Sequence, residues 1–206
     1  MKKLEAVIFD MDGVLFDTER MSCECCFEAA KQLGLTLAEE AVYGGCGNEA
    51  SLRRHIMETE EPWYPNGTFP YEKYRERFMA LFQESLEREL PIKKGVRELL
   101  EYLKEKQIKT AIASSTKGPL VRKHLERAGL SGYFQEIVSG DMVEKSKPEP
   151  DIYLKACEAV GVLPENAMGI EDSFNGIRAV AAAGMTAVMV PDMVQPDEEI
   201  RQIYAS

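Results

Sequence analysis

Two aspartates, Asp10 and Asp12, follow directly on a short apolar segment formed by residues 4–9. A spacing of two places both side chains on the same side of an extended backbone. Two acids held this close repel each other, and burying both is costly unless a cation compensates their charge. Gly13 then lets the chain turn out of the segment. The pattern indicates a carboxylate site that requires a cation.

Three further apolar segments also lead to polar residues: 109–113 to Ser114, 134–138 through a loop to Lys145 and Lys147, and 167–170 to Glu171 and Asp172. Carboxylates dominated by aspartate, with no histidine among them, suit a hard cation such as Mg²⁺. A hydroxyl and a lysine beside them suit a phosphate group. The residue types therefore predict a site for Mg²⁺ and a phosphate.

The elements that must position these residues are strands alternating with helices. The apolar segments are typical of parallel strands buried on both faces, and 186–190 predicts a last strand. From Gly95 onward, helical patterns separate the strands, which predicts a parallel α/β sheet with right-handed crossovers. Ligands bind at the carboxyl ends of such strands. The polar residues should therefore meet at one edge of the sheet.

Residues 18–90 lack any strand pattern, so the sequence predicts a helical insert there. Pro91 marks its end, which predicts one domain from residues 1–17 and 91–206 and a second from 18–90. The insert should contain helices at 19–33, 37–43, 51–59 and 71–89, with a glycine loop at 44–48 and the single tryptophan at Trp63.

Four predicted helices end in a glycine followed by an apolar residue: Gly34, Gly129, Gly161 and Gly184. This ending is typical of a glycine in the left-handed conformation, with the next residue packing back on the helix.

The net charge of −10 argues against a nucleic acid or an anionic membrane as partner. An anionic small molecule remains compatible with it, because a local cation can reverse the field in one pocket. No signal peptide and no run as long as a membrane helix is visible. Five cysteines, three of them at Cys23, Cys25 and Cys26, indicate reduced thiols and a cytoplasmic protein. The oligomeric state stays open, and a monomer is compatible with the sequence.

The chain resembles the haloacid dehalogenase superfamily over nearly its whole length. Four stretches carry the resemblance: Asp10-Met-Asp-Gly-Val-Leu-Phe-Asp-Thr18, Ser114 in Ile-Ala-Ser-Ser, Lys147 in Ser-Lys-Pro-Glu-Pro-Asp, and Glu171-Asp172-Ser-Phe-Asn-Gly176. Lys147 is preferred to Lys145 because it precedes the Pro-x-Pro-Asp stretch, as in relatives. The helical insert resembles the small α-helical cap of the β-phosphoglucomutase-like branch. The resemblance implies a Rossmann-like core and a mobile cap.

The resemblance also implies a role for each site residue. Asp10 is the nucleophile that forms an aspartyl-phosphate, and Asp12 is the acid and base. Mg²⁺ is held by Asp10, the Asp12 carbonyl and Asp172, with Glu171 bound directly or through water. Ser114 and Lys147 hold the phosphoryl group, and Thr18 and Ser115 are further substrate contacts. Asp12 distinguishes this chain from the dehalogenases of the superfamily, which lack the second aspartate.

These features predict a Mg²⁺-dependent phosphatase of a small phosphorylated metabolite, such as a sugar phosphate. A β-phosphoglucomutase-type mutase is the alternative, but the histidine and arginine of such mutases are replaced by Ser22 and Asn48. The cations available to replace that arginine are Arg53, Arg54, Lys73, Arg75 and Arg77. A non-catalytic binding protein on the same scaffold is a third possibility, and the intact Asp10, Asp12, Lys147 and Asp172 argue against it.

Overall fold

The computed structural model describes residues 3–37, 39, 42, 69–192 and 195–204. The chain divides into two compact units. The core unit consists of Met1–Asp17 and Pro91–Ser206, and the helical unit consists of Thr18–Leu90.

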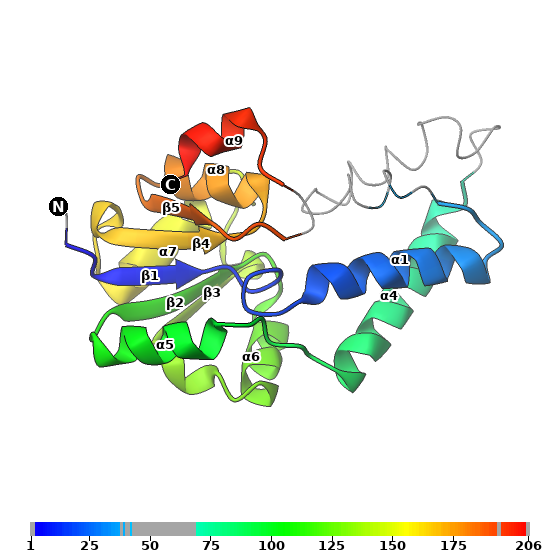
Figure 1. The fold of residues 1–206 in the computed structure, drawn as a ribbon, viewed down its shortest axis with the longest axis horizontal. Coiled ribbons are helices and arrows are strands. Elements are labelled where there is room, and N and C mark those ends of the chain that lie inside the picture. Colours follow the sequence, from blue (N-terminus) through cyan, green and yellow to red (C-terminus); the bar gives the residue numbers. More distant parts are fainter. Residues whose placement is uncertain (1–2, 38, 40–41, 43–68, 193–194, 205–206) are drawn as a thin grey trace. The chain divides into compact units, whose positions relative to one another are not determined.

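The core unit contains a five-stranded parallel sheet with the strand order β3-β2-β1-β4-β5 (Figure 1). The strands are β1 (Ala6–Phe9), β2 (Lys109–Ser114), β3 (Glu136–Ser139), β4 (Ala167–Glu171) and β5 (Thr186–Met189). The α/β class predicted from the alternating pattern is confirmed. Asp10 follows the central strand, so the sheet brings it between the ends of β2 and β4.

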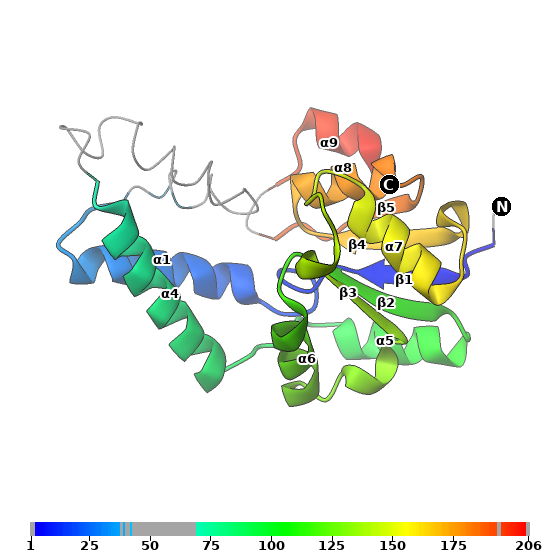
Figure 2. The same cartoon turned by 180° about the vertical axis from the view of Figure 1, so that it is seen from behind.

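Helices cover the sheet on both sides (Figures 1 and 2). The helices of the core unit are α5 (Val96–Glu105), α6 (Gly118–Arg127), α7 (Asp151–Val160), α8 (Phe174–Ala182) and α9 (Glu198–Ile203). Alternate residues of a strand point to opposite faces. One face packs against α7 and α8, because residues of both helices share an apolar cluster with Ala6 and Ile8.

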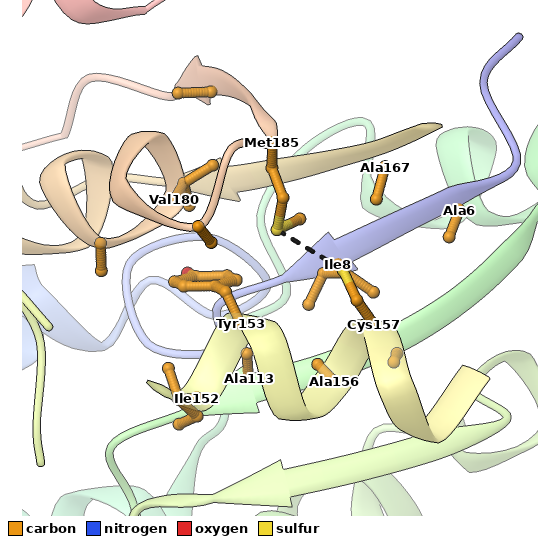
Figure 3. Packing of buried hydrophobic residues seen from close by; sticks show 14 of the residues in the cluster. Ala6, Ile8, Ala113, Ile152, Tyr153, Ala156, Cys157, Ala167, Val180 and Met185 are labelled. Atoms are coloured by element: carbon orange, nitrogen blue, oxygen red, sulfur yellow. Dashed lines mark hydrogen bonds between the residues drawn. The ribbon is translucent and has the colours of Figure 1, made fainter. Parts of the chain in front are cut away.

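That cluster is close-packed (Figure 3). Ile8, Ala113, Ala156 and Tyr153 have no exposed surface. Burying a side chain the size of isoleucine stabilises a fold by about 1.5–3 kcal/mol, so this cluster supports the strands that carry the site. Tyr153 is unusual among these residues because it brings a hydroxyl into an apolar layer.

The strand register aligns the carboxyl ends of the strands. Phe9 lies beside Ile112 and Ile170, and Ser114 lies beside Ser139. The residues that follow these positions therefore leave the sheet at one edge, as the sequence predicts.

Two elements of the core unit differ from the sequence-based expectation. The strand predicted at 134–138 is Glu136–Ser139, because its ladder begins opposite Ala111 and the preceding residues form a short 3₁₀ turn at Ser131–Tyr133. Helix α9 was not predicted. Asp197 caps it by accepting a hydrogen bond from the Ile200 amide at 2.8 Å.

The helical unit contains α1 (Thr18–Gln32) and α4 (Tyr71–Arg88), which pack against each other. Ala29 and Ala30 of α1 share an apolar cluster with Phe69, Tyr71 and Tyr74. The cysteines of α1 are buried and form no disulfide bond among the described residues. The predicted helices at 37–43 and 51–59, the loop at 44–48 and Trp63 lie outside the described residues, apart from residues 39 and 42.

Among the residues that the model describes, none belongs to a helix with the length and apolar character that crossing a membrane requires.

Candidate active site

Lys147 lies at the centre of the candidate site, at the carboxyl edge of the sheet. Its side chain is 8% exposed, and its Nζ donates to three oxygens. The acceptors are Asp10 Oδ1 at 2.5 Å, Glu171 Oε1 at 2.6 Å and the Ala113 carbonyl at 3.0 Å. An ammonium group has three N–H donors, so all of them are satisfied. Burial alone would lower the pKa of Lys147, but the charges of Asp10 and Glu171 outweigh this effect and raise it.

Asp10 is the first residue after β1 and is 7% exposed. Its amide donates to the Ile170 carbonyl at 3.0 Å, which extends the pairing of β1 with β4 by one residue. Burial raises the pKa of the Asp10 carboxyl, the Lys147 ammonium opposes that shift, and the charges of Glu171 and Asp12 add to it. A cation at this position would therefore be needed to keep Asp10 charged at neutral pH.

Glu171 is the last residue of β4 and is 1% exposed. Its Oε1 accepts hydrogen bonds from Lys147 and from the Tyr153 hydroxyl, both at 2.6 Å. Its Oε2 accepts the Ser173 hydroxyl at 3.1 Å. A Cβ added at Gly176 would lie 1.9 Å from the carboxyl carbon of Glu171, so only glycine leaves this space.

Asp12 and Ser114 are linked through Thr116. The Thr116 hydroxyl donates to Asp12 Oδ2 at 2.8 Å, and the Thr116 amide donates to Ser114 Oγ at 3.1 Å. Ser114 is 1% exposed at the end of β2. The structure thus connects the ends of β1 and β2 through one threonine side chain and its amide.

Asp172 completes a group of three carboxylates. One oxygen each from Asp10, Glu171 and Asp172 lies within 4.8 Å of the others. Asp172 packs against Gly13, where φ is +76° and an added Cβ would lie 2.0 Å from Asp172 Oδ2. A set made only of oxygen donors fits Mg²⁺ better than a softer metal.

The structure brings together Asp10, Asp12, Ser114, Lys147, Glu171 and Asp172 at one edge of the sheet. Lys145, the other lysine of the same loop, is exposed. Ser115 lines a cavity of about 300 Å³ together with Lys117, Asp141, Ser146 and Lys147. Thr18, a predicted substrate contact, is the buried first residue of α1 and belongs to the helical unit.

Three residues that contact this group were not predicted from the sequence: Thr116, Tyr153 and Ser173. The sequence does contain an indication for Tyr153, because a tyrosine on the inward face of an apolar helix needs a hydrogen-bond partner. Ser173 also had a signal as the residue before α8. Its hydroxyl accepts the Gly176 amide at 3.0 Å, so it caps the helix and contacts Glu171 at once.

Comparisons with known proteins agree with this site. The family model for the haloacid dehalogenase-like hydrolases matches residues 7–190. The "Phosphorylated carbohydrates phosphatase" of Thermotoga maritima is 38% identical over 189 residues, which cover 90% of this chain and 84% of that protein. The protein CbbY of Cereibacter sphaeroides is 34% identical, with 95% and 88% covered.

A solved structure described as a putative β-phosphoglucomutase from Thermotoga maritima has a TM-score of 0.77 and 33% identity. The match covers 98% of this chain and 92% of that one. The family model includes the ends of β1 and β4, where the carboxylates gather, and each of these relatives covers most of the chain. The chain therefore belongs to the haloacid dehalogenase-like hydrolases.

Proposed function

We propose that this protein is a Mg²⁺-dependent phosphatase of a small phosphorylated metabolite, with a sugar phosphate as the preferred class. The chain is a hydrolase of phosphoric monoesters by family. The main observation in support of a phosphatase that acts through Asp10 is the contact of Lys147 with Asp10 and Glu171, beside the second aspartate, Asp12. The relative named for phosphorylated carbohydrates supports the substrate class.

In the first step, an oxygen of Asp10 attacks phosphorus. A bond forms between that oxygen and phosphorus, and the bond from phosphorus to the ester oxygen breaks. The electron pair stays on the leaving oxygen, which takes a proton from Asp12. The products of this step are the free alcohol and an aspartyl-phosphate at Asp10.

In the second step, Asp12 takes a proton from a water molecule whose oxygen attacks phosphorus. The bond between Asp10 and phosphorus breaks, and inorganic phosphate leaves. In both steps, Ser114 donates to a phosphoryl oxygen, and the positive charge of Lys147 offsets the charge that develops on the phosphoryl group. The Thr116 hydroxyl keeps the Asp12 carboxyl in a fixed orientation between its two proton transfers.

Asp10, Asp172 and the Asp12 carbonyl would hold Mg²⁺, with Glu171 bound directly or through water. The bound ion would supply positive charge that lets an anionic nucleophile approach an anionic phosphate. The raised pKa of Asp10 supports this role, because the site needs added positive charge to keep the nucleophile ionised.

A mutase is the second candidate, and the solved structure described as a putative β-phosphoglucomutase favours it. Ser22, where such mutases have a histidine, is buried in α1, and Asn48 lies outside the described residues. Among the alternative cations, Lys73 and Arg75 lie exposed on α4, and the Arg77 Nε donates to Gln32 at 2.5 Å. Arg53 and Arg54 also lie outside the described residues.

The direct test measures phosphate release from p-nitrophenyl phosphate and from a panel of phosphorylated metabolites, with Mg²⁺ and after EDTA treatment. Release that requires Mg²⁺, together with a sharply higher Mg²⁺ requirement in Asp172→Ala, would support the proposal. No release from any compound in the presence of Mg²⁺ would overturn it and favour a non-catalytic role.

A further inference from the structure

We propose that Tyr153 is a positioning residue that fixes Lys147 at the phosphoryl site by acting through Glu171. The inference rests on the proposed phosphatase function and adds to it a residue outside the four stretches that indicate the family. Tyr153 would not touch the substrate. It would determine where the Lys147 ammonium group lies relative to the phosphoryl group.

The first support is the position of the hydroxyl. Tyr153 has no exposed surface, and its ring lies in the apolar cluster between α7 and the sheet (Figure 3). Its hydroxyl donates a hydrogen bond to Glu171 Oε1 at 2.6 Å. A buried hydroxyl without a partner is costly, so this contact accounts for a polar group at a position that phenylalanine would otherwise fill.

The second support is that Tyr153 and Lys147 share one oxygen. Both donate to Glu171 Oε1 at 2.6 Å, while Ser173 occupies Oε2. The Glu171 carboxylate is thus held from two sides, and Gly176 leaves no room for it to shift toward α8. Because Lys147 Nζ bridges Glu171 and Asp10, any shift of Glu171 Oε1 moves the cation relative to the nucleophile.

The third support is that the Tyr153 ring itself borders the cation. Lys147 Nζ lies 5.2 Å from the centre of the ring, within the range of a cation–π contact. Removing the hydroxyl leaves this ring contact and the packing in place. The variant Tyr153→Phe therefore isolates the hydrogen bond to Glu171, and exposed Tyr102 offers a matched control for the same substitution.

The test compares the unaltered protein with Tyr153→Phe, Tyr102→Phe, Glu171→Gln and the double variant Tyr153→Phe/Glu171→Gln. Calorimetric titration with inorganic phosphate in the presence of Mg²⁺ gives a readout that does not depend on turnover. Hydrolysis of p-nitrophenyl phosphate gives kcat and KM, and thermal unfolding reports the fold.

We expect Tyr153→Phe to weaken phosphate binding and to lower kcat by about 10- to 100-fold, the effect of losing one hydrogen bond to a charged group. Tyr102→Phe should change neither. In the double variant, the loss should be no larger than in Glu171→Gln alone, because both substitutions weaken the same charge-assisted contact between Tyr153 and residue 171.

Unchanged phosphate affinity in Tyr153→Phe, or losses that multiply in the double variant, would overturn the proposal. So would a Tyr153→Phe protein that does not fold, because the hydroxyl would then be required by the core. If the unaltered protein hydrolyses no phosphate ester, the proposed function fails, and the phosphate titration still decides the role of Tyr153.

Discussion

At the scale of single residues, the site holds more negative charge than its one buried lysine can balance. Lys147 contacts Asp10 and Glu171. Asp12 lies close enough to Asp10 to affect its pKa, and Asp172 lies beside Asp10 and Glu171. Burial raises the pKa of Asp10, so the folded protein binds a proton there more tightly than the unfolded chain does. Between the unfolded and the folded pKa, the charge on Asp10 therefore lowers stability as the pH rises.

Replacing Asp10 with asparagine should abolish turnover and stabilise the metal-free protein at neutral pH. The amide keeps the shape of the carboxyl group and removes the nucleophile. It also removes the cost of protonating or burying a carboxylate at this position on folding. We expect the melting temperature without Mg²⁺ to rise by about 2–4 °C, which corresponds to ~1 kcal/mol in a chain of this size. Thermal unfolding with and without Mg²⁺ measures this effect.

Asp141→Asn is the matched control. Asp141 lies at the same edge of the sheet, but its pKa is lowered where that of Asp10 is raised. Hydrogen bonds from the Ser139 side chain and the Gly118 amide lower the pKa of Asp141, so its charge favours the folded state. This variant should melt at a lower temperature and stay active. A melting temperature that falls in Asp10→Asn would show that Lys147 overcompensates the buried carboxylate.

At the scale of elements, the start of α8 and the end of β4 fit together only because residue 176 is glycine. Gly176→Ala would improve the helix by about 1 kcal/mol on propensity alone. The added Cβ, however, would lie about 2 Å from the Glu171 carboxylate, which Lys147 and Tyr153 hold in place. We expect a net loss of about 1–3 kcal/mol in the free energy of unfolding and a lower kcat.

Gly132→Ala is the control for that prediction, since an added Cβ there meets nothing within 4 Å. We expect the free energy of unfolding of this variant, measured with denaturant, to equal that of the unaltered protein or to be slightly higher. Its kcat for p-nitrophenyl phosphate should be unchanged. If Gly176→Ala has the same free energy of unfolding and the same kcat as Gly132→Ala, then Glu171 can shift without loss and its fixed position is not required.

The elements themselves were largely predictable, because their signals are local. The strands before Asp10 and Glu171 are short apolar runs, and the four glycines predicted to end helices all have positive φ: Gly34, Gly129, Gly161 and Gly184. Helix α9 was missed because its six residues are too few for a clear apolar period. The strand order β3-β2-β1-β4-β5 is set by long-range pairing, which no local pattern contains.

The charged residues of the site could be predicted from the sequence, but their hydrogen bonds could not. Carboxylates and lysines after apolar runs are visible in a sequence. The contact of Tyr153 with Glu171 joins residues on α7 and β4, and that of Thr116 with Asp12 joins the ends of β2 and β1. Such contacts depend on how the elements pack, so spacing along the chain does not predict them.

At the scale of the whole molecule, the choice between phosphatase and mutase depends on whether a second phosphate group is held outside the core. Ser22 and Asn48 replace the histidine and arginine expected of a mutase. Without those groups, the aspartyl-phosphate should react with water before a second sugar hydroxyl attacks it. We therefore expect β-glucose 1-phosphate, where it is accepted, to release inorganic phosphate faster than it forms glucose 6-phosphate.

The assay for that prediction follows both products in the presence of a little glucose 1,6-bisphosphate, because a mutase needs priming. Conversion to glucose 6-phosphate with almost no phosphate release would replace the phosphatase assignment with the mutase. Lys73 and Arg75, two exposed cations of α4, would then be the first residues to replace with alanine, together with Arg53, Arg54 and Arg77.

The covalent step at Asp10 is tested most directly by mass spectrometry of the protein quenched in acid during turnover. The proposed mechanism predicts one added phosphoryl group on the peptide that contains Asp10, present only with substrate and Mg²⁺ and absent from Asp10→Asn. Steady turnover with no phosphoryl group on that peptide, or with the group on another residue, would contradict the assignment of Asp10 as the nucleophile.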